Sequence, residues 1–250
     1  MSGIDLAVTV ITRNEGKRIG ACLASVAFAG EIIVVDSGST DDTVALAQQH
    51  GARVTQTSDW PGFGAQKNRA IDLATSSWIL SIDADERVTP QLREQILSAI
   101  ANNDHSAYAI NRRSSYCGQY MQHSGWYPDR VVRLFRRGTA RFSDDLVHES
   151  LQVQGVVGRL EGDLLHESFD DFEAVLEKTN RYSTAGALAL HRKGVQGSFA
   201  KALGHGLWAF VRTYVFKRGF LDGKLGFALA ISNAEGTYYR YLKLWLLQRR

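Results

Sequence analysis

The sequence predicts an α/β fold with a doubly wound, mostly parallel central sheet and a helical extension at the C-terminal end. Two observations carry this prediction. Segments with strand patterning alternate with segments of helical patterning through residues 1–104. After residue 169 the patterning is almost entirely helical. Regular alternation of this kind is typical of a parallel sheet that is covered by helices on both faces.

The alternating elements follow one another closely. The strand over 32–35 is wholly apolar, as in parallel sheets that are buried on both faces. Thr89 and Pro90 open a helix, because Thr caps helices and Pro suits their first position. In full, we expect strands over 5–11, 32–35, 52–57 and 78–82, and helices over 18–28, 43–50, 66–74 and 89–101.

The remainder of the chain changes character twice. Short strand-like pieces lie between loops rich in Ser, Gly and Arg, and long helical segments follow them. The expected strands cover 108–111, 131–135 and 164–166, and the expected helices cover 169–192, 198–216 and 225–247. The chain is therefore expected to have three successive parts, residues 1–104, 105–168 and 169–250.

Composition excludes several classes of protein. Of 250 residues, 44% are hydrophobic and 22% are charged, which excludes fibrous and wholly disordered chains. Two cysteines cannot form a disulfide framework, so a reducing, cytoplasmic location is expected. The N-terminus lacks the pattern of a signal peptide. The longest stretch without charged residues, 114–128, is polar, so no membrane-spanning helix is expected.

Charge is distributed unevenly. Residues 1–100 carry 8 basic and 12 acidic side chains, whereas residues 191–250 carry 11 basic and 2 acidic ones. An anionic partner is therefore expected at the C-terminal end. Apolar residues also recur there at helical spacing, namely Leu203, Leu207, Phe210, Val211, Tyr214 and Val215.

A basic amphipathic segment with aromatic residues suits the surface of an anionic membrane. Two alternatives are a helix pair that packs on the rest of the chain and a module that binds nucleic acid. The acidic residues near the expected strand ends argue against nucleic acid, so no nucleic-acid partner is predicted.

Polar residues follow three of the expected strands, at 12–15, 36–39 and 83–86. In a doubly wound sheet, ligands bind outside the carboxyl ends of the strands. Asp83 and Asp85 can point the same way and offer the hard oxygen ligands that Mg²⁺ and Mn²⁺ prefer. The alternative is an acidic turn that caps the helix near Pro90.

These three motifs, together and in this order, resemble those of family 2 glycosyltransferases. They are VTVITRNE at 8–15, VVDSGSTDDT at 34–43 and ILSIDADE at 79–86. Further stretches are similar to the bacterial β-1,4-glucosyltransferase branch that builds the lipopolysaccharide inner core: FGAQKNRA at 63–70, RLFR at 133–136, VHE at 147–149 and FLDG at 220–223.

The resemblance implies an A-type glycosyltransferase fold, with residues 1–104 binding the nucleotide sugar and residues 105–168 binding the acceptor. It implies a UDP-sugar donor. The residues expected to bind this donor are Thr12, Asn14, Asp36, Lys67, Asn68, Asp83 and Arg133. Thr12 and Asp36 would contact the uridine, and Ser37 stands where many members have a second Asp. Lys67 and Asn68 would lie near the diphosphate.

The resemblance also implies an inverting reaction and a metal ion, Mg²⁺ or Mn²⁺. Asp83 would reach the ribose or the metal, Asp85 would coordinate the metal, and His166 is a further candidate ligand. A carboxylate must accept the proton of the attacking hydroxyl. Glu149 is predicted for this role and Asp145 is the second choice.

Each of these residues has a simpler interpretation. Glu149 is otherwise a surface carboxylate paired with His148 or a nearby Arg, and His166 is otherwise an ordinary hydrogen-bonded histidine. Arg133, Arg136 and Arg137 either bind phosphate or lie on a solvated edge strand.

The expected function is transfer of a hexose, glucose from UDP-glucose, to a hydroxyl of a lipid-linked saccharide, the inner-core heptose of lipopolysaccharide. The chain would work at the cytoplasmic face of the inner membrane, as a peripheral protein. One alternative keeps the donor and uses another acceptor, such as a polyprenyl phosphate, a capsule precursor or a peptide. A remoter alternative is a non-catalytic protein that binds membranes or nucleic acid.

Overall fold

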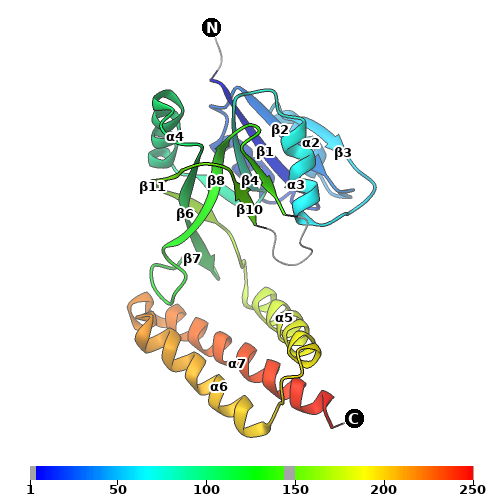
Figure 1. Ribbon diagram of the computed structural model, residues 1–250, viewed down its shortest axis with the longest axis vertical. Coiled ribbons are helices and arrows are strands. Elements are labelled where there is room, and N and C mark those ends of the chain that lie inside the picture. Colours follow the sequence, from blue (N-terminus) through cyan, green and yellow to red (C-terminus); the bar gives the residue numbers. More distant parts are fainter. Residues whose placement is uncertain (1–3, 144–149, 250) are drawn as a thin grey trace. The chain divides into compact units, whose positions relative to one another are not determined.

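The computed structural model describes residues 4–143 and 150–249, and the chain divides into two compact units. Unit 1 consists of residues 1–112 and 129–166, and unit 2 of residues 113–128 and 167–250. Unit 1 holds the central sheet and unit 2 holds three long helices (Figure 1). The expected α/β class with a helical C-terminal extension is confirmed.

The first half of the sheet follows the predicted alternation. Strands β3, β2, β1 and β4 are neighbours in that order, and all of them run parallel. Each expected helix connects two of them or follows the last. The elements are β1 (Leu6–Thr12), α1 (Ile19–Ser25), β2 (Glu31–Asp36), α2 (Thr43–Gln49), β3 (Arg53–Gln56), α3 (Phe63–Asp72), β4 (Trp78–Asp83) and α4 (Pro90–Asn102).

The second half of the sheet contains antiparallel pairs. β8 is antiparallel to both β4 and β6, and β11 is antiparallel to β5. The order beyond β4 is β8 (Asp129–Arg136), β6 (Ala107–Tyr116), β11 (Val157–His166) and β5 (Glu86–Val88). The parallel arrangement thus covers the four strands that helices connect. Short strands β9 (Ala140–Phe142) and β10 (Leu151–Val153) form a separate pair.

The core of unit 1 lies on both faces of the sheet. Leu6, Val8 and Val10 of β1 pack with Leu23 of α1 and with α4. Ala7, the alternate residue on β1, belongs to the cluster on the opposite face, where Ile71 of α3 and Phe135 of β8 pack. Successive side chains of a strand point to opposite faces, so a sheet covered on both sides requires continuously apolar strands.

Helix α4 begins as the sequence predicts. The Thr89 side chain accepts a hydrogen bond from the backbone N–H of Leu92 at 3.3 Å, and Pro90 is the first helical residue. The acidic stretch at Asp83 and Asp85 is separated from this helix by β5 and does not cap it. The capping interpretation of this stretch is therefore wrong.

Unit 2 is built from α5 (Phe172–Arg192), α6 (Phe199–Val211) and α7 (Gly223–Leu247), and α7 packs against the other two (Figure 1). The expected helix over 198–216 ends in a π-helical turn, η1 (Arg212–Phe216), where the Lys217 N–H donates to the Arg212 carbonyl at 2.8 Å. A short 3₁₀ turn, η2 (Gly219–Asp222), leads into α7. Within 4–143 and 150–249, no helix has the length and hydrophobicity that a bilayer crossing requires.

Asp222 connects two segments of unit 2. Its buried carboxylate accepts hydrogen bonds from the N–H of Gln122 at 3.0 Å, the N–H of His123 at 3.1 Å and the Ser124 hydroxyl at 2.8 Å. These donors follow β7 (Gln119–Tyr120), which pairs with the end of β6. The motif at 220–223 thus has a structural role, because it fixes the loop at 122–124 to the start of α7.

Candidate active site

Polar residues gather at the carboxyl edge of the parallel strands in unit 1. In the sheet register, Thr12 at the end of β1 pairs with Asp36 at the end of β2, and Ile11 pairs with Asp83 at the end of β4. The three polar strand ends therefore meet at one edge, where ligands of doubly wound sheets bind.

Hydrogen bonds hold the first two strand ends in shape. Asn14, in the left-handed conformation with φ 55°, accepts from the Thr40 N–H at 2.8 Å and donates its own N–H to the Ser39 hydroxyl at 2.8 Å. The fully buried Asp36 carboxylate accepts from the N–H groups of Gly38 at 3.1 Å and Ser39 at 3.0 Å. Both side chains shape the loops at this edge, and their contact with a nucleotide remains a prediction.

Thr12 and Ser37 differ in how their hydroxyls are used. The buried Thr12 hydroxyl has no hydrogen-bond partner in the described part of the chain. A buried polar group without a partner costs about 1–3 kcal/mol, and a hydrogen bond from a bound ligand would offset that cost. The Ser37 hydroxyl accepts from the amide of Gln66 at 2.9 Å. Gln66 is buried, and the sequence did not predict a role for it.

Asp83 lies between two cations. Its Oδ1 is 3.0 Å from the Lys67 ammonium, and its Oδ2 accepts from the Arg133 guanidinium at 2.7 Å. Lys67 and Arg133 are almost fully buried. Burial raises the pKa of Asp83, but Arg133 and Lys67 outweigh burial and hold this pKa well below its ordinary range. Asp83 is therefore ionised, and it positions both cations.

Glu86 completes this cluster and was not predicted to have a role. The same Arg133 nitrogen donates to Glu86 Oε1 at 2.8 Å, and the Asp83 N–H donates to Glu86 Oε2 at 2.9 Å. The Glu86 side chain has no solvent exposure. Burial raises the pKa of Glu86, and Asp83 adds to that increase although Arg133 opposes it. The only signal in the sequence was its place at the end of the acidic motif.

A cavity of about 300 Å³ adjoins this cluster. Three cationic side chains line it, Lys67, Arg112 and Arg133, against one carboxylate, Asp83. Arg112 is held by Asp129, which accepts from it at 2.7 Å. The buried Arg133 Nε has no partner among the described residues. This N–H group, together with the Lys67 ammonium at the wall, suits a phosphate-bearing ligand. The remaining lining residues are Val131, Val132, Phe142, Ser150 and Leu151.

Asn68 supports the wall of this cavity. Its side-chain amide donates to the Phe142 carbonyl at 3.0 Å and accepts from the Phe142 N–H at 3.0 Å. The Lys67 ammonium lies 5.1 Å from the centre of the Phe142 ring. Asn68 therefore holds β9 next to Lys67, and its contact with a diphosphate remains a prediction.

Asp85 and His166 form a second pair. His166 Nε2 is 3.4 Å from Asp85 Oδ2, and His166 lies opposite Glu86 in the β11–β5 register. Carboxylate oxygen and imidazole nitrogen are both metal ligands. The described residues contain no cluster of three or more His, Cys, Asp or Glu suited to a metal. The pair fits a metal that takes its other ligands from substrate phosphates and water, as Mg²⁺ commonly does.

The other predicted residues lie elsewhere. Glu149 and Asp145 fall outside the described residues. Arg136 pairs in register with Trp78 at the start of β4, at the end of that strand opposite to Asp83, and donates to the Asn103 carbonyl at 2.6 Å. Among the arginines considered for phosphate binding, Arg133 therefore lines the cavity and Arg136 does not.

Comparisons with known proteins agree with this architecture. The profile of the family described as "Glycosyl transferase family 2" matches residues 7–150. The lipopolysaccharide core biosynthesis glycosyltransferase LpsC of Rhizobium meliloti is 31% identical, over 95% of this chain and 93% of its own length. An uncharacterized glycosyltransferase of Rickettsia typhi is 30% identical, over 94% of this chain and 85% of its own.

A crystal structure of S. aureus TarS 1–349 in complex with UDP superimposes with a TM-score of 0.51 at 15% identity, covering 98% of this chain and 92% of that one. This similarity shows a shared fold. The expected A-type architecture and the resemblance of the three motifs are confirmed.

Proposed function

Because the chain belongs to glycosyltransferase family 2, we propose that it transfers glucose from UDP-glucose, with inversion, to a hydroxyl of the lipopolysaccharide inner core. One observation carries this proposal: Asp83 holds Lys67 and Arg133 at the carboxyl edge of the parallel sheet. The acceptor, an inner-core heptose, is proposed because LpsC, named for lipopolysaccharide core biosynthesis, matches nearly the whole chain.

The donor would lie along the carboxyl edge of the parallel strands. The unpartnered hydroxyl of Thr12 and the loops shaped by Asn14 and Asp36 would receive the uridine. Lys67 and Arg133, which line the cavity, would bind the diphosphate through their N–H groups. Asp83, which is ionised, keeps both cations in place before the donor arrives.

For this transfer the protein must position the donor and the acceptor, and it must supply a base for the proton of the acceptor hydroxyl. The oxygen of the acceptor hydroxyl bonds to the anomeric carbon as the bond from that carbon to the diphosphate breaks, and UDP leaves with the electron pair. Lys67 and Arg133 stabilise the negative charge that develops on UDP. The proton of the hydroxyl passes to a carboxylate, for which we propose Glu149, with Asp145 as the second choice.

Asp85 and His166 would hold the metal ion, Mg²⁺ or Mn²⁺, and Asp83 would lie beside it. When bound, such an ion neutralises charge on the diphosphate as it leaves. Both oxygens of Asp83 already contact cations, so the Asp85–His166 pair is the stronger candidate for coordination.

Unit 2 would bind the cytoplasmic face of the inner membrane peripherally. Of the predicted apolar stripe, Phe210 and Tyr214 pack against Phe227 of α7. Leu207 is 68% exposed, and the neighbouring Trp208, outside the predicted stripe, is 55% exposed. Lysines and arginines surround these exposed residues in the sequence, and exposed apolar residues beside cations favour an anionic bilayer.

Calorimetric titration of UDP into the full chain, with and without Mn²⁺, tests the donor and metal sites. We expect Mn²⁺ to strengthen UDP binding in the wild type, and Asp85→Ala and His166→Ala to remove that enhancement. Asp72→Ala is the matched control, since Asp72 forms an exposed ion pair with Arg141. Absence of UDP binding in every condition would overturn the proposed donor, and an enhancement retained in both variants would overturn the proposed metal ligands.

A further inference from the structure

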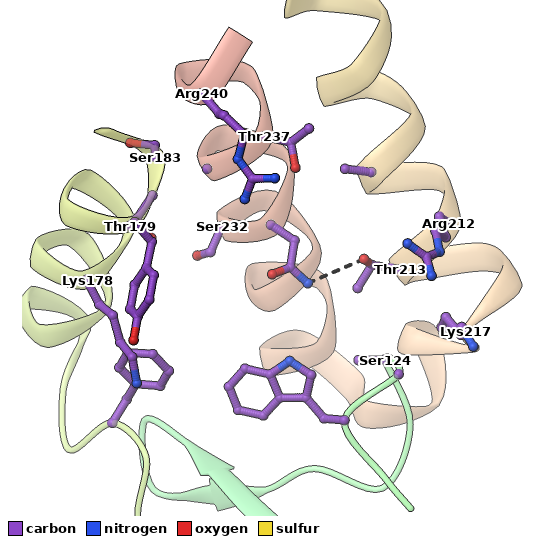
Figure 2. Close-up of a pocket in the computed structure, with 17 residues that line it drawn as sticks. Ser124, Lys178, Thr179, Ser183, Arg212, Thr213, Lys217, Ser232, Thr237 and Arg240 are labelled. Carbon is purple, nitrogen blue, oxygen red and sulfur yellow. Dashed lines mark hydrogen bonds between the residues drawn. The ribbon is translucent and has the colours of Figure 1, made fainter. Parts of the chain in front are cut away.

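Unit 2 contains a cavity of about 520 Å³, which we call the helical pocket. Its wall is formed by α5, by the end of α6 with η1, by α7 and by the segment at 124–126 (Figure 2). Pockets of this size accept small-molecule ligands. The lining residues are Ser124, Gly125, Trp126, Phe169, Lys178, Thr179, Tyr182, Ser183, Ala209, Arg212, Thr213, Lys217, Ser232, Asn233, Gly236, Thr237 and Arg240.

The lining of the helical pocket is cationic. Lys178 comes from α5, Arg212 and Lys217 from the π turn and the residue after it, and Arg240 from α7. None of the lining residues is Asp or Glu. Cations in a lining that includes no carboxylate create a positive potential that attracts an anion. This composition differs from that of the unit 1 cavity, where Asp83 lines the wall with the cations.

Two glycines make room for two of these cations. A Cβ atom on Gly186 of α5 would lie 2.6 Å from Arg240 Nε, so the Arg240 side chain extends across the position that a larger residue would fill. A Cβ atom on Gly125 would lie 3.4 Å from Lys217 Cγ. The Lys178 ammonium lies 4.6 Å from the centre of the Phe169 ring. Arg240, Lys217 and Lys178 thus each lie close to a residue of a neighbouring segment.

Hydroxyl and amide groups complete the lining. The Asn233 amide donates to the Thr213 hydroxyl at 3.3 Å, the bond drawn as a dashed line in Figure 2. Arg240 and Arg212 approach this pair from different sides of the pocket in that view. Thr213 and Arg212 belong to the π turn, a local geometry that is frequent at functional sites. Guanidinium forks with neighbouring hydroxyls match a phosphate or carboxylate.

We propose that the helical pocket binds a phosphate or carboxylate group carried by the saccharide acceptor. The inference rests on the proposed function, since it specifies the acceptor as an anionic saccharide. Arg212 and Arg240 bind the oxyanion, and the hydroxyl and aromatic side chains, Trp126 and Tyr182 among them, contact the sugar. A neutral saccharide would leave Arg212 and Arg240 without an anionic ligand in the pocket.

The test is calorimetric titration of the full chain with four probes: glucose 6-phosphate, glucose, inorganic phosphate and vesicles of phosphatidylglycerol. We expect glucose 6-phosphate to bind more tightly than inorganic phosphate and glucose. Arg212→Ala and Arg240→Ala are each expected to weaken glucose 6-phosphate binding at least about tenfold, the scale of a lost hydrogen bond to a charged group. Both residues are exposed, so the variants should fold.

Two further variants separate position from charge. Gly186→Ala keeps every charge and displaces Arg240, and should also weaken glucose 6-phosphate binding. Arg192→Ala removes an exposed cation at the end of α5 that does not line the pocket, and should leave binding unchanged. UDP affinity, measured in parallel, should be the same in all four variants because no lining residue of the helical pocket lies in unit 1.

The outcomes separate the possible ligands. Glucose 6-phosphate binding that does not depend on Arg212 and Arg240 overturns the proposal. If inorganic phosphate binds as tightly as glucose 6-phosphate, the sugar contributes nothing to binding, and the proposal is overturned. If only the binding of vesicles depends on both arginines, the pocket binds a lipid headgroup, and the proposal is also overturned. If UDP fails to bind while glucose 6-phosphate binding depends on both arginines, the donor proposal fails and the anion site stands.

Discussion

The cationic side chains of unit 1 and unit 2 differ in their burial and in their carboxylate partners. In unit 1, Lys67 and Arg133 are buried, and each contacts the Asp83 carboxylate. In unit 2, Arg212 and Arg240 are exposed and line a pocket to which no carboxylate contributes. The first site is compensated within the fold and its geometry is set before any ligand binds. The lining of the second includes no carboxylate, which is the basis for proposing an anionic ligand there.

The two units also differ in the number of large apolar side chains that they expose. Of the 20 exposed large hydrophobic side chains in the described part of the chain, 4 lie in unit 1 and 16 in unit 2. Unit 2 therefore exposes more large apolar side chains than unit 1 does. This difference supports the proposals that a membrane and an anionic ligand bind unit 2, whereas the buried cations of unit 1 are paired within the fold.

Removing Glu86 should have the largest effect on stability. Glu86→Ala leaves buried Arg133 with one carboxylate partner instead of two, and breaking a buried ion pair costs about 3–5 kcal/mol. Urea denaturation measures the loss. In unit 2, Arg240→Ala should change the free energy of unfolding by less than about 0.5 kcal/mol, because the residue is exposed.

The control for Glu86→Ala is Asp72→Ala in the same unit. The Asp72–Arg141 pair is exposed, with side-chain exposures of 56% and 58%, and such pairs contribute about 0–1 kcal/mol. A loss in Glu86→Ala as small as the loss in Asp72→Ala would contradict the idea that unit 1 depends on its internal charge compensation.

Asp222 is the exception within unit 2, a buried carboxylate with three donors from the segment at 122–124. Asp222→Asn should cost about 2 kcal/mol, because hydrogen bonds to a charged group contribute about 1.5–3 kcal/mol. Hydrogen exchange should accelerate at the Gln122 and His123 amides. Glu235→Gln on α7 makes the same charge change and should alter stability by less than about 0.5 kcal/mol. Unchanged exchange in Asp222→Asn would show that this carboxylate does not hold the loop.

The exposed apolar residues of α6 should govern membrane binding. Leu207→Glu and Trp208→Glu are each expected to lower partition onto phosphatidylglycerol vesicles at least about tenfold, since burying one large apolar side chain contributes about 1.5–3 kcal/mol. Val156→Glu is the matched control: Val156 is 67% exposed and lies in unit 1. Sedimentation measures all three. Equal losses in the control would mean that membrane binding is not specific to unit 2.

The order of the first elements was predictable because local patterning decides it. A continuously apolar strand and the helix start at Thr89–Pro90 can each be recognised from residues that are adjacent in the sequence. Strands β5, β9 and β10 were missed, since three residues are too few to show a period and their partners are remote in sequence. The π turn η1 was not predicted, because apolar residues recur in it at the same spacing as in the preceding helix α6.

The site was predictable where a motif carries it and not where partners are set by topology. Asp83 and Asp85 follow an expected strand, so their place at its end could be predicted, and their roles stay predictions. The double contact of Arg133 with Asp83 and Glu86 arises because β8 lies beside β4 in the sheet, and no local pattern encodes that order. The Asn68 contact with Phe142 spans 74 residues in the same way.

The smallest expected effect comes from two buried tyrosines, one in each unit. Their ionisation should change the free energy of unfolding in the same way in both units. Burial raises the pKa of Tyr108 in unit 1 and of Tyr116 in unit 2. Above pH 10 the unfolded chain releases these protons and the folded chain retains them, so the free energy of unfolding falls as pH rises, by up to about 1.4 kcal/mol per pH unit and group. Tyr108→Phe and Tyr116→Phe should each flatten this slope in urea denaturation between pH 10 and about 11. Below pH 9 all three chains should show parallel pH profiles. If the slope flattens in only one variant, the two units differ in how they bury neutral tyrosines as well as in how they pair charges.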